Sequence, residues 1–141
     1  MAEELSKARY EALAEFRHQL RRFLRFSEEA VRAVDIEPQQ HQMMLAIKGS
    51  PAESLTVGGI AERLQIQHHS AVELVARAEV RGLVRRTRGE TDRRQVYVDL
   101  TDTGATALRD LASIHHRELV TAAPELIRVL QRIVDDETDR A

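Results

Sequence analysis

Apolar residues recur at three- and four-residue steps through the first part of the chain, with arginine and glutamate between them. This spacing predicts one long amphipathic helix over about residues 4–34. At 1.5 Å per residue the helix would be roughly 45 Å long, which is more than a small domain can cover. Part of its apolar stripe is therefore expected to pack against another subunit. Pro38 then opens a second, shorter helix that Gly49 ends.

A tight pair of helices follows in the sequence. Thr56 is a suitable N-cap for a helix over residues 57–64, and a second helix is expected over residues 68–81, where Gly82 stops it. Two short helices joined by a turn of about three residues form the helix-turn-helix pattern.

Beyond this pair, the apolar period changes from helical to alternating. The alternation predicts two strands, over residues 83–88 and 95–100, joined by a tight turn. A two-stranded hairpin is unstable alone, so this one is expected to pack beside the helix-turn-helix as a wing. Two more helices are expected, one capped by Thr101 or Asp102 and one that begins at Pro124.

These elements predict a mainly α fold with a small two-stranded β wing. The central part of the predicted fold is a winged helix-turn-helix over about residues 37–102. It is flanked by N- and C-terminal dimerisation helices, over about residues 1–36 and 103–141. The whole chain, residues 1–141, is expected to be a single domain, since no linker or repeat interrupts it.

Composition narrows the class of protein. Cysteine is absent, which excludes disulfides and thiolate metal sites and is typical of a reducing compartment. No apolar run approaches the roughly 18 residues that span a bilayer, and the polar N-terminus does not resemble a signal peptide. We therefore expect a cytoplasmic protein with no membrane partner.

Basic charge is concentrated in one segment. Residues 63–94 hold eight basic and four acidic residues, a net charge of +4, while the rest of the chain carries −6. This asymmetry is typical of a polyanion-binding element on an acidic body, although a charge run can equally be a solvated face.

The residues predicted to meet DNA lie on the second helix of the pair and at the hairpin tip. That helix enters the major groove in helix-turn-helix proteins, and its N-terminal residues meet base edges. A narrow, basic hairpin tip suits the minor groove. Asp92 is expected to hold an arginine or the turn backbone rather than to touch DNA. There are two alternatives to DNA contact. The histidines could be ordinary surface residues at a helix start, and the wing arginines could form purely structural salt bridges. The predicted contacts are Gln67, His68, His69, Ser70, Glu73 and Arg77 on the helix, and Arg88, Arg93 and Arg94 on the wing.

The segment from Asp92 to Gly104, D-R-R-Q-V-Y-V-D-L-T-D-T-G, resembles the wing of the MarR family of bacterial regulators, in which D-x-R is followed by an alternating strand and L-T-x-x-G. Residues 55–64 and 74–84 resemble the two helices that precede the wing in that family. The resemblance covers nearly the whole chain. It implies a homodimer on a near-palindromic operator, with Arg94 in the minor groove and Asp92 steadying it.

The resemblance also implies a repressor that releases DNA when a small, often aromatic or anionic, effector binds. The chain departs from the family at Val72-Glu73, where many members carry Thr or Ser with a basic residue, and at Ala76, where Asp is frequent. Its base preference is therefore expected to differ. Several residues could line an effector pocket, although each could equally be core: Leu20, Phe23, Phe26, His41, Met43 and Met44.

Other chemistry finds little support in the sequence. His41, His115 and His116 invite a regulatory metal site, but adjacent histidines on a helix point about 100° apart, so no metal site is predicted. The chain has no phosphate-cradling glycine loop and no nucleophile elbow, so neither a cofactor nor an enzymatic activity is predicted. The competing function is a winged helix used for protein–protein contact or as a non-specific architectural DNA binder.

Overall fold

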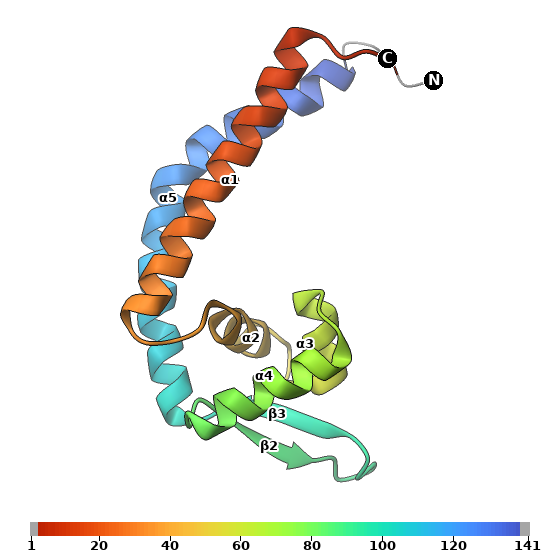
Figure 1. The fold of residues 1–141 in the computed structure, drawn as a ribbon, viewed down its shortest axis with the longest axis vertical. Helices are drawn as coiled ribbons and strands as arrows, with labels where there is room; N and C mark the ends of the chain where they lie inside the picture. Colours follow the sequence, from red (N-terminus) through yellow and green to blue (C-terminus); the bar gives the residue numbers. More distant parts are fainter. Residues whose placement is uncertain (1–2, 139–141) are drawn as a thin grey trace. The chain divides into compact units, whose positions relative to one another are not determined.

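The computed structural model describes residues 3–138 of the chain. The chain divides into two compact units, which we call the helical unit and the winged unit. The helical unit holds the chain up to Glu29 and from Ser113 onward, and the winged unit holds Ala30–Ala112. The described elements, in chain order, are α1 (Lys7–Ala33), α2 (Pro38–Lys48), β1 (Ser54–Thr56), α3 (Val57–Leu64), α4 (His68–Val80), β2 (Val84–Arg88), β3 (Val96–Leu100) and α5 (Asp102–Thr138) (Figure 1).

The predicted helix-turn-helix is present as α3 and α4. The Thr56 side chain caps α3, because its Oγ1 accepts the backbone N–H of Gly59 at 3.0 Å. Gln65 ends α3 in the left-handed conformation with φ of 55°, and Gly82 follows α4 with φ of 71°. The start of α3 and the end of α4 therefore follow from residues that the sequence displays, Thr56 and Gly82.

The wing hairpin belongs to a three-stranded antiparallel sheet in the order β1–β3–β2. Strands β2 and β3 are the predicted hairpin, with Arg86 opposite Val98. The additional strand is β1, in which Leu55 lies opposite Val98 from the other side. A strand of three residues directly before a helix has too few positions to display alternation, so the sequence predicted two strands where three are formed. The mainly α winged-helix fold class is confirmed.

The core of the winged unit holds α4 in place. Its buried residues come from the apolar positions of all the neighbouring elements, and α4 alone contributes Ala71, Leu74, Val75 and Ala78, each with none of its surface exposed. Residues Met43, Met44 and Ile47 of α2 complete this core together with Ile60, Val84, Val98, Leu108 and Leu111. Burying one face of α4 so completely fixes which face is left for a partner.

The helical unit is an antiparallel pair formed by α1 and the later part of α5 (Figure 1). Arg9 near the start of α1 pairs with Asp136 near the end of α5, with 3.7 Å between Nε and Oδ2. Helix α5 runs without a break through Pro124, so the prediction of two separate helices is wrong. Proline removes one helical hydrogen bond, but Pro124 is exposed, and Ala122, Leu126 and Val129 continue one partly or fully buried face across it. Packing along that face holds the helix together.

Within residues 3–138, no helix is both long enough and apolar enough to cross a membrane.

Candidate nucleic-acid interface

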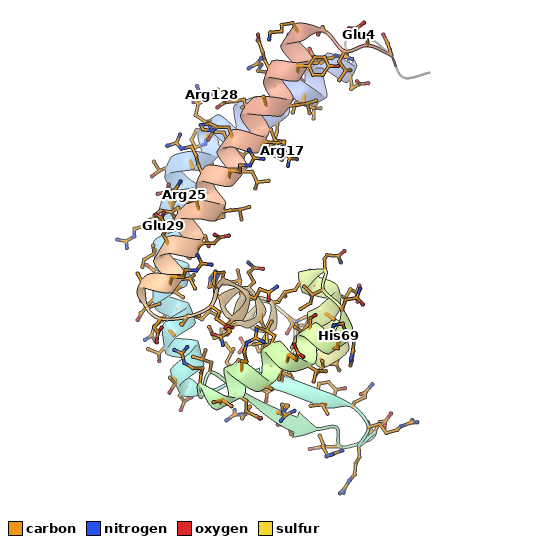
Figure 2. All side chains as sticks on the ribbon, viewed as in Figure 1. Glu4, Arg17, Arg25, Glu29, His69 and Arg128 are labelled. Carbon is orange, nitrogen blue, oxygen red and sulfur yellow. The ribbon has the colours of Figure 1, made fainter. Side chains whose placement is uncertain are left out.

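One ridge of α4 faces away from the core. His69, Glu73, Ala76 and Val80 follow one another at steps of four, three and four residues, which places them on one helix face. This face is opposite the buried residues of α4, and Val80 at its end has 88% of its surface exposed. His69 marks the ridge in Figure 2. We call these four residues the reading ridge, and it carries no basic group other than the His69 ring.

One flank of α4 is tied to the turn between α1 and α2. The Arg77 Nε lies 3.2 Å from Glu37 Oε2. One turn further along, an Arg81 guanidinium nitrogen donates to the backbone oxygen of Asp35 at 2.6 Å. Arg77, which the sequence predicted as a DNA contact, thus lies beside the reading ridge and points towards Glu37. Exposed ion pairs contribute at most about 1 kcal/mol, so a phosphate could compete for Arg77.

The other flank of α4 is tied to the wing. The Arg86 guanidinium on β2 binds Glu79 on α4 in a bidentate manner, with nitrogen–oxygen distances of 2.8 Å and 3.2 Å. This hydrogen bonding from Arg86 holds the pKa of Glu79 below its ordinary value. The pair joins α4 to β2 through two side chains.

The wing tip presents three arginines around a hydrogen-bonded turn. Asp92 Oδ1 accepts both the Nε of Arg94 at 3.1 Å and its backbone N–H at 3.0 Å. Side-chain and then backbone hydrogen bonds from Arg94 hold the pKa of Asp92 below its ordinary value. The Arg94 side chain is nevertheless 92% exposed. Arg88 donates to the backbone oxygen of Arg93 at 3.1 Å. The Arg93 guanidinium itself has no carboxylate partner among residues 3–138.

A groove of about 440 Å³ separates α4 from the wing. Its floor is apolar, and three basic side chains line it, Arg86 and Arg94 from the wing side and His68 from the α4 side. His68 therefore lies in this groove and not on the reading ridge. Gln67, the N-cap residue of α4, is exposed, and Ser70 is half-buried on the flank that carries Arg77. The apolar floor consists of Val57, Val72, Val75 and Val96.

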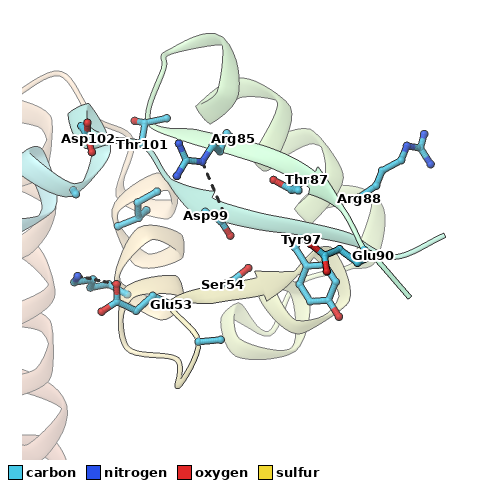
Figure 3. Close-up of a pocket in the computed structure, with 15 residues that line it drawn as sticks. Glu53, Ser54, Arg85, Thr87, Arg88, Glu90, Tyr97, Asp99, Thr101 and Asp102 are labelled. Atoms are coloured by element: carbon cyan, nitrogen blue, oxygen red, sulfur yellow. Dashed lines mark hydrogen bonds and ion pairs between the residues drawn. The ribbon is translucent and has the colours of Figure 1, made fainter. Parts of the chain in front are cut away.

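The outer face of the sheet carries a second, polar hollow that the sequence did not predict (Figure 3). It has a volume of about 610 Å³. Its charges face one another: Arg85 Nε lies 3.9 Å from Asp99 Oδ2, and Lys48 Nζ lies 3.1 Å from Glu53 Oε2. Two cations of this face are therefore paired with carboxylates, whereas Arg93 at the wing tip has no carboxylate partner among residues 3–138.

The predicted effector-pocket residues fall in both units. In the helical unit, Phe23 and Phe26 contact the buried ring of His115 edge-on, at centroid distances of 6.2 Å and 6.1 Å. The His115 Nε2 lies 2.6 Å from the Ser27 Oγ. Leu20, in the same unit, is 39% exposed.

In the winged unit, Met43 and Met44 are fully buried core residues and His41 is buried. Within residues 3–138, no three histidine or carboxylate side chains gather closely enough to hold a metal ion. His116 is exposed, unlike its buried neighbour His115.

Part of the chain is also similar in sequence to a known protein family. The model of the MarR family matches residues 34–95. No curated protein gives a significant sequence match.

Several solved structures resemble the chain over most of its length. AbsC, a MarR family transcriptional regulator from Streptomyces coelicolor, superposes with a TM-score of 0.78 at 18% identity, over 99% of this chain and 97% of that one. Sco3205, a MarR family transcriptional regulator from the same organism solved in complex with DNA, gives 0.76 at 21% identity, over 99% and 91%. A point mutant of MarR from E. coli, complexed with operator DNA, gives 0.69 at 20% identity, over 95% and 98%. At these identities the similarity establishes the fold.

Proposed function

We propose that this chain is a MarR family protein that binds double-stranded DNA and regulates transcription. The observation that carries the proposal is the placement of the reading ridge of α4 beside a wing whose tip bears Arg88, Arg93 and Arg94. A helix face fits the major groove, and a narrow arginine-bearing loop fits the adjacent minor groove. Three arginines at one tip match the phosphate contacts that contribute much of the affinity of DNA-binding proteins.

Fluorescence anisotropy tests this proposal with the DNA upstream of the protein's own gene against a scrambled duplex. We expect selective binding to the upstream DNA that weakens steeply as salt rises, because phosphate contacts release counterions. Arg93→Glu with Arg94→Glu should abolish tight binding and flatten the salt dependence. Arg25→Glu, at an 83% exposed position of α1, is the control for altered charge and should leave binding nearly unchanged.

The remaining outcomes distinguish the alternatives. Equal, weak binding to both duplexes would indicate an architectural DNA binder or an operator elsewhere in the genome. No binding to either duplex by the folded protein would favour a protein-interaction module.

The proposed active form is a homodimer joined through the helical unit. The support is an apolar surface that this unit leaves exposed: Leu20 and Leu24 of α1 are 39% and 45% exposed, and Val120, Ile127 and Val134 of α5 are 63%, 62% and 58% exposed. The three α5 residues recur every seven positions, as expected of one helix stripe that meets another helix. An apolar stripe that stays exposed to water does not stabilise a monomer, and such patches are typical of protein–protein contact sites.

Light scattering coupled to size exclusion measures the oligomeric state directly. Ile127→Glu should convert a dimer to a monomer and weaken operator binding, since two linked winged units bind DNA far more tightly than one. Thr121→Glu is the matched control, because Thr121 shares the polar side of α5 with Arg128 and Asp135. A wild-type monomer would contradict the proposal.

We further propose that the protein is a repressor that responds to a small aromatic or anionic effector. The half-buried Phe23 and Phe26 in the helical unit support an aromatic ligand, because they offer two aromatic rings in one place. Displacement of operator DNA by benzoate and related aromatic carboxylates tests this proposal. Phe23→Ala should weaken the response, while the absence of displacement by any of them would contradict it.

A further inference from the structure

Glu73 is a carboxylate without a cationic partner at the centre of the reading ridge. The other carboxylate of α4, Glu79, binds Arg86 in a bidentate manner, and Asp92 of the wing binds Arg94. No hydrogen bond or ion pair involving the Glu73 side chain is present among residues 3–138. Arg77 lies four residues further along α4, at the usual spacing for an ion pair, yet it binds Glu37 instead.

An exposed carboxylate on this ridge is costly when DNA approaches. Phosphates surround the major groove, and like charges repel one another. Hydrogen bonds from a base to the carboxylate oxygens would offset this cost, and the base must supply the donor because an ionised carboxylate has no proton to donate. The identity of the base then follows from the donors that the major groove displays.

Only two bases present a donor in the major groove. Cytosine displays its N4 amino group, and adenine displays its N6 amino group beside the N7 acceptor. The N7 lone pair of adenine repels a carboxylate, and the acceptors of guanine and thymine do so as well. Cytosine is thus the one base that offers a donor to Glu73 without an adjacent acceptor on the same base.

We propose that Glu73 determines base specificity by accepting a hydrogen bond from a cytosine N4 amino group, once in each half-site of the operator. This inference rests on the proposed DNA-binding function and adds the base that is read. The neighbouring ridge residue Ala76 supports close approach, because its side chain is a single methyl group and leaves room for Glu73 to reach a base edge. The reading ridge has no arginine, so the usual bidentate contact to guanine is absent from it.

Selection of duplexes from a randomised library tests the proposal with the full-length protein. The wild type should enrich one G·C pair per half-site, at which replacing cytosine weakens binding by about 10- to 100-fold. Glu73→Gln should shift the preference at that position to A·T, because an amide pairs with both N6 and N7 of adenine. Glu73→Ala should remove the preference there and leave the other selected positions unchanged.

Glu62→Gln is the matched control, because Glu62 is an exposed carboxylate of α3 that loses the same charge. It should leave every selected position unchanged. If Glu73→Ala retains the wild-type preference at all positions, or if Glu62→Gln alters the same position, the inference is overturned while the DNA-binding function stands. If the wild type enriches no sequence, sequence-specific regulation and the inference both fail. Since Glu73 is exposed, circular dichroism should show all the variants folded.

Discussion

The close approach of α5 to the start of the wing provides a stringent test of the winged unit. Gly104, in the first turn of α5, has no side chain, and a Cβ added there would overlap the backbone oxygen of Leu83 and lie 2.9 Å from its carbonyl carbon. Leu83 cannot move away easily. Its oxygen accepts the N–H of Thr101 at 3.1 Å, and its own N–H binds the Ala78 oxygen at 3.0 Å.

Gly104→Ala should therefore destabilise the protein, against the usual helix preference. An alanine in a helix is ordinarily favoured over glycine by about 0.5–1 kcal/mol. Overpacking a tight site typically costs about 1–3 kcal/mol, and an overlap with hydrogen-bonded backbone belongs at the upper end of that range. The expected net loss is about 2 kcal/mol, which lowers the urea midpoint by about 1 M for a chain of this size.

The assay is urea unfolding followed by circular dichroism, with every variant at one protein concentration because the proposed dimerisation would contribute to stability. Gly58→Ala is the matched control. Its added Cβ would meet nothing closer than the Thr56 Oγ1 at 4.0 Å, so the helix preference should raise the midpoint. A Gly104→Ala protein as stable as the wild type would show that α5 and Leu83 are not held this closely.

Three further outcomes follow from the winged unit. Leu74→Ala should lower the free energy of unfolding by about 2–5 kcal/mol, because Leu74 is fully buried and its removal leaves a cavity; a loss below about 1 kcal/mol in urea unfolding would contradict that burial. Thr56→Ala should lower the free energy of unfolding by about 0.5–2 kcal/mol through loss of the α3 cap. Thr56→Ser keeps the hydroxyl and should retain most of that free energy, so equal losses in the two variants would exclude a capping role. The Asp92–Arg94 contact should be complete above the ordinary pKa of an aspartate and be lost as the pH falls through the lowered pKa of Asp92. A carboxyl NMR titration should place the Asp92 midpoint below that of an unpaired aspartate, and Arg94→Ala should raise it; a midpoint that Arg94→Ala leaves unchanged would contradict the contact.

Local signals in the sequence were sufficient for most of the winged unit. The cap at Thr56, the stop at Gly82 and the change to alternation after it placed α3, α4 and the hairpin within a residue or two. These signals act between residues close in the chain, so a single sequence displays them. The arginines of the wing tip were visible for the same reason, since the turn that gathers them is itself local.

The tertiary structure decided the features that depend on distant residues. Pro124 stays inside α5 because residues on both sides of it share a face buried against α1, and β1 forms because β3 offers it a partner. Arg77 binds Glu37, forty residues away in the chain. That pairing leaves Glu73 without a cation on its own helix, and no local pattern could have predicted it. Helix periodicity fixed which residues share a face of α4, but only the packed neighbours determined which charges on that face were already neutralised and which remained for a partner.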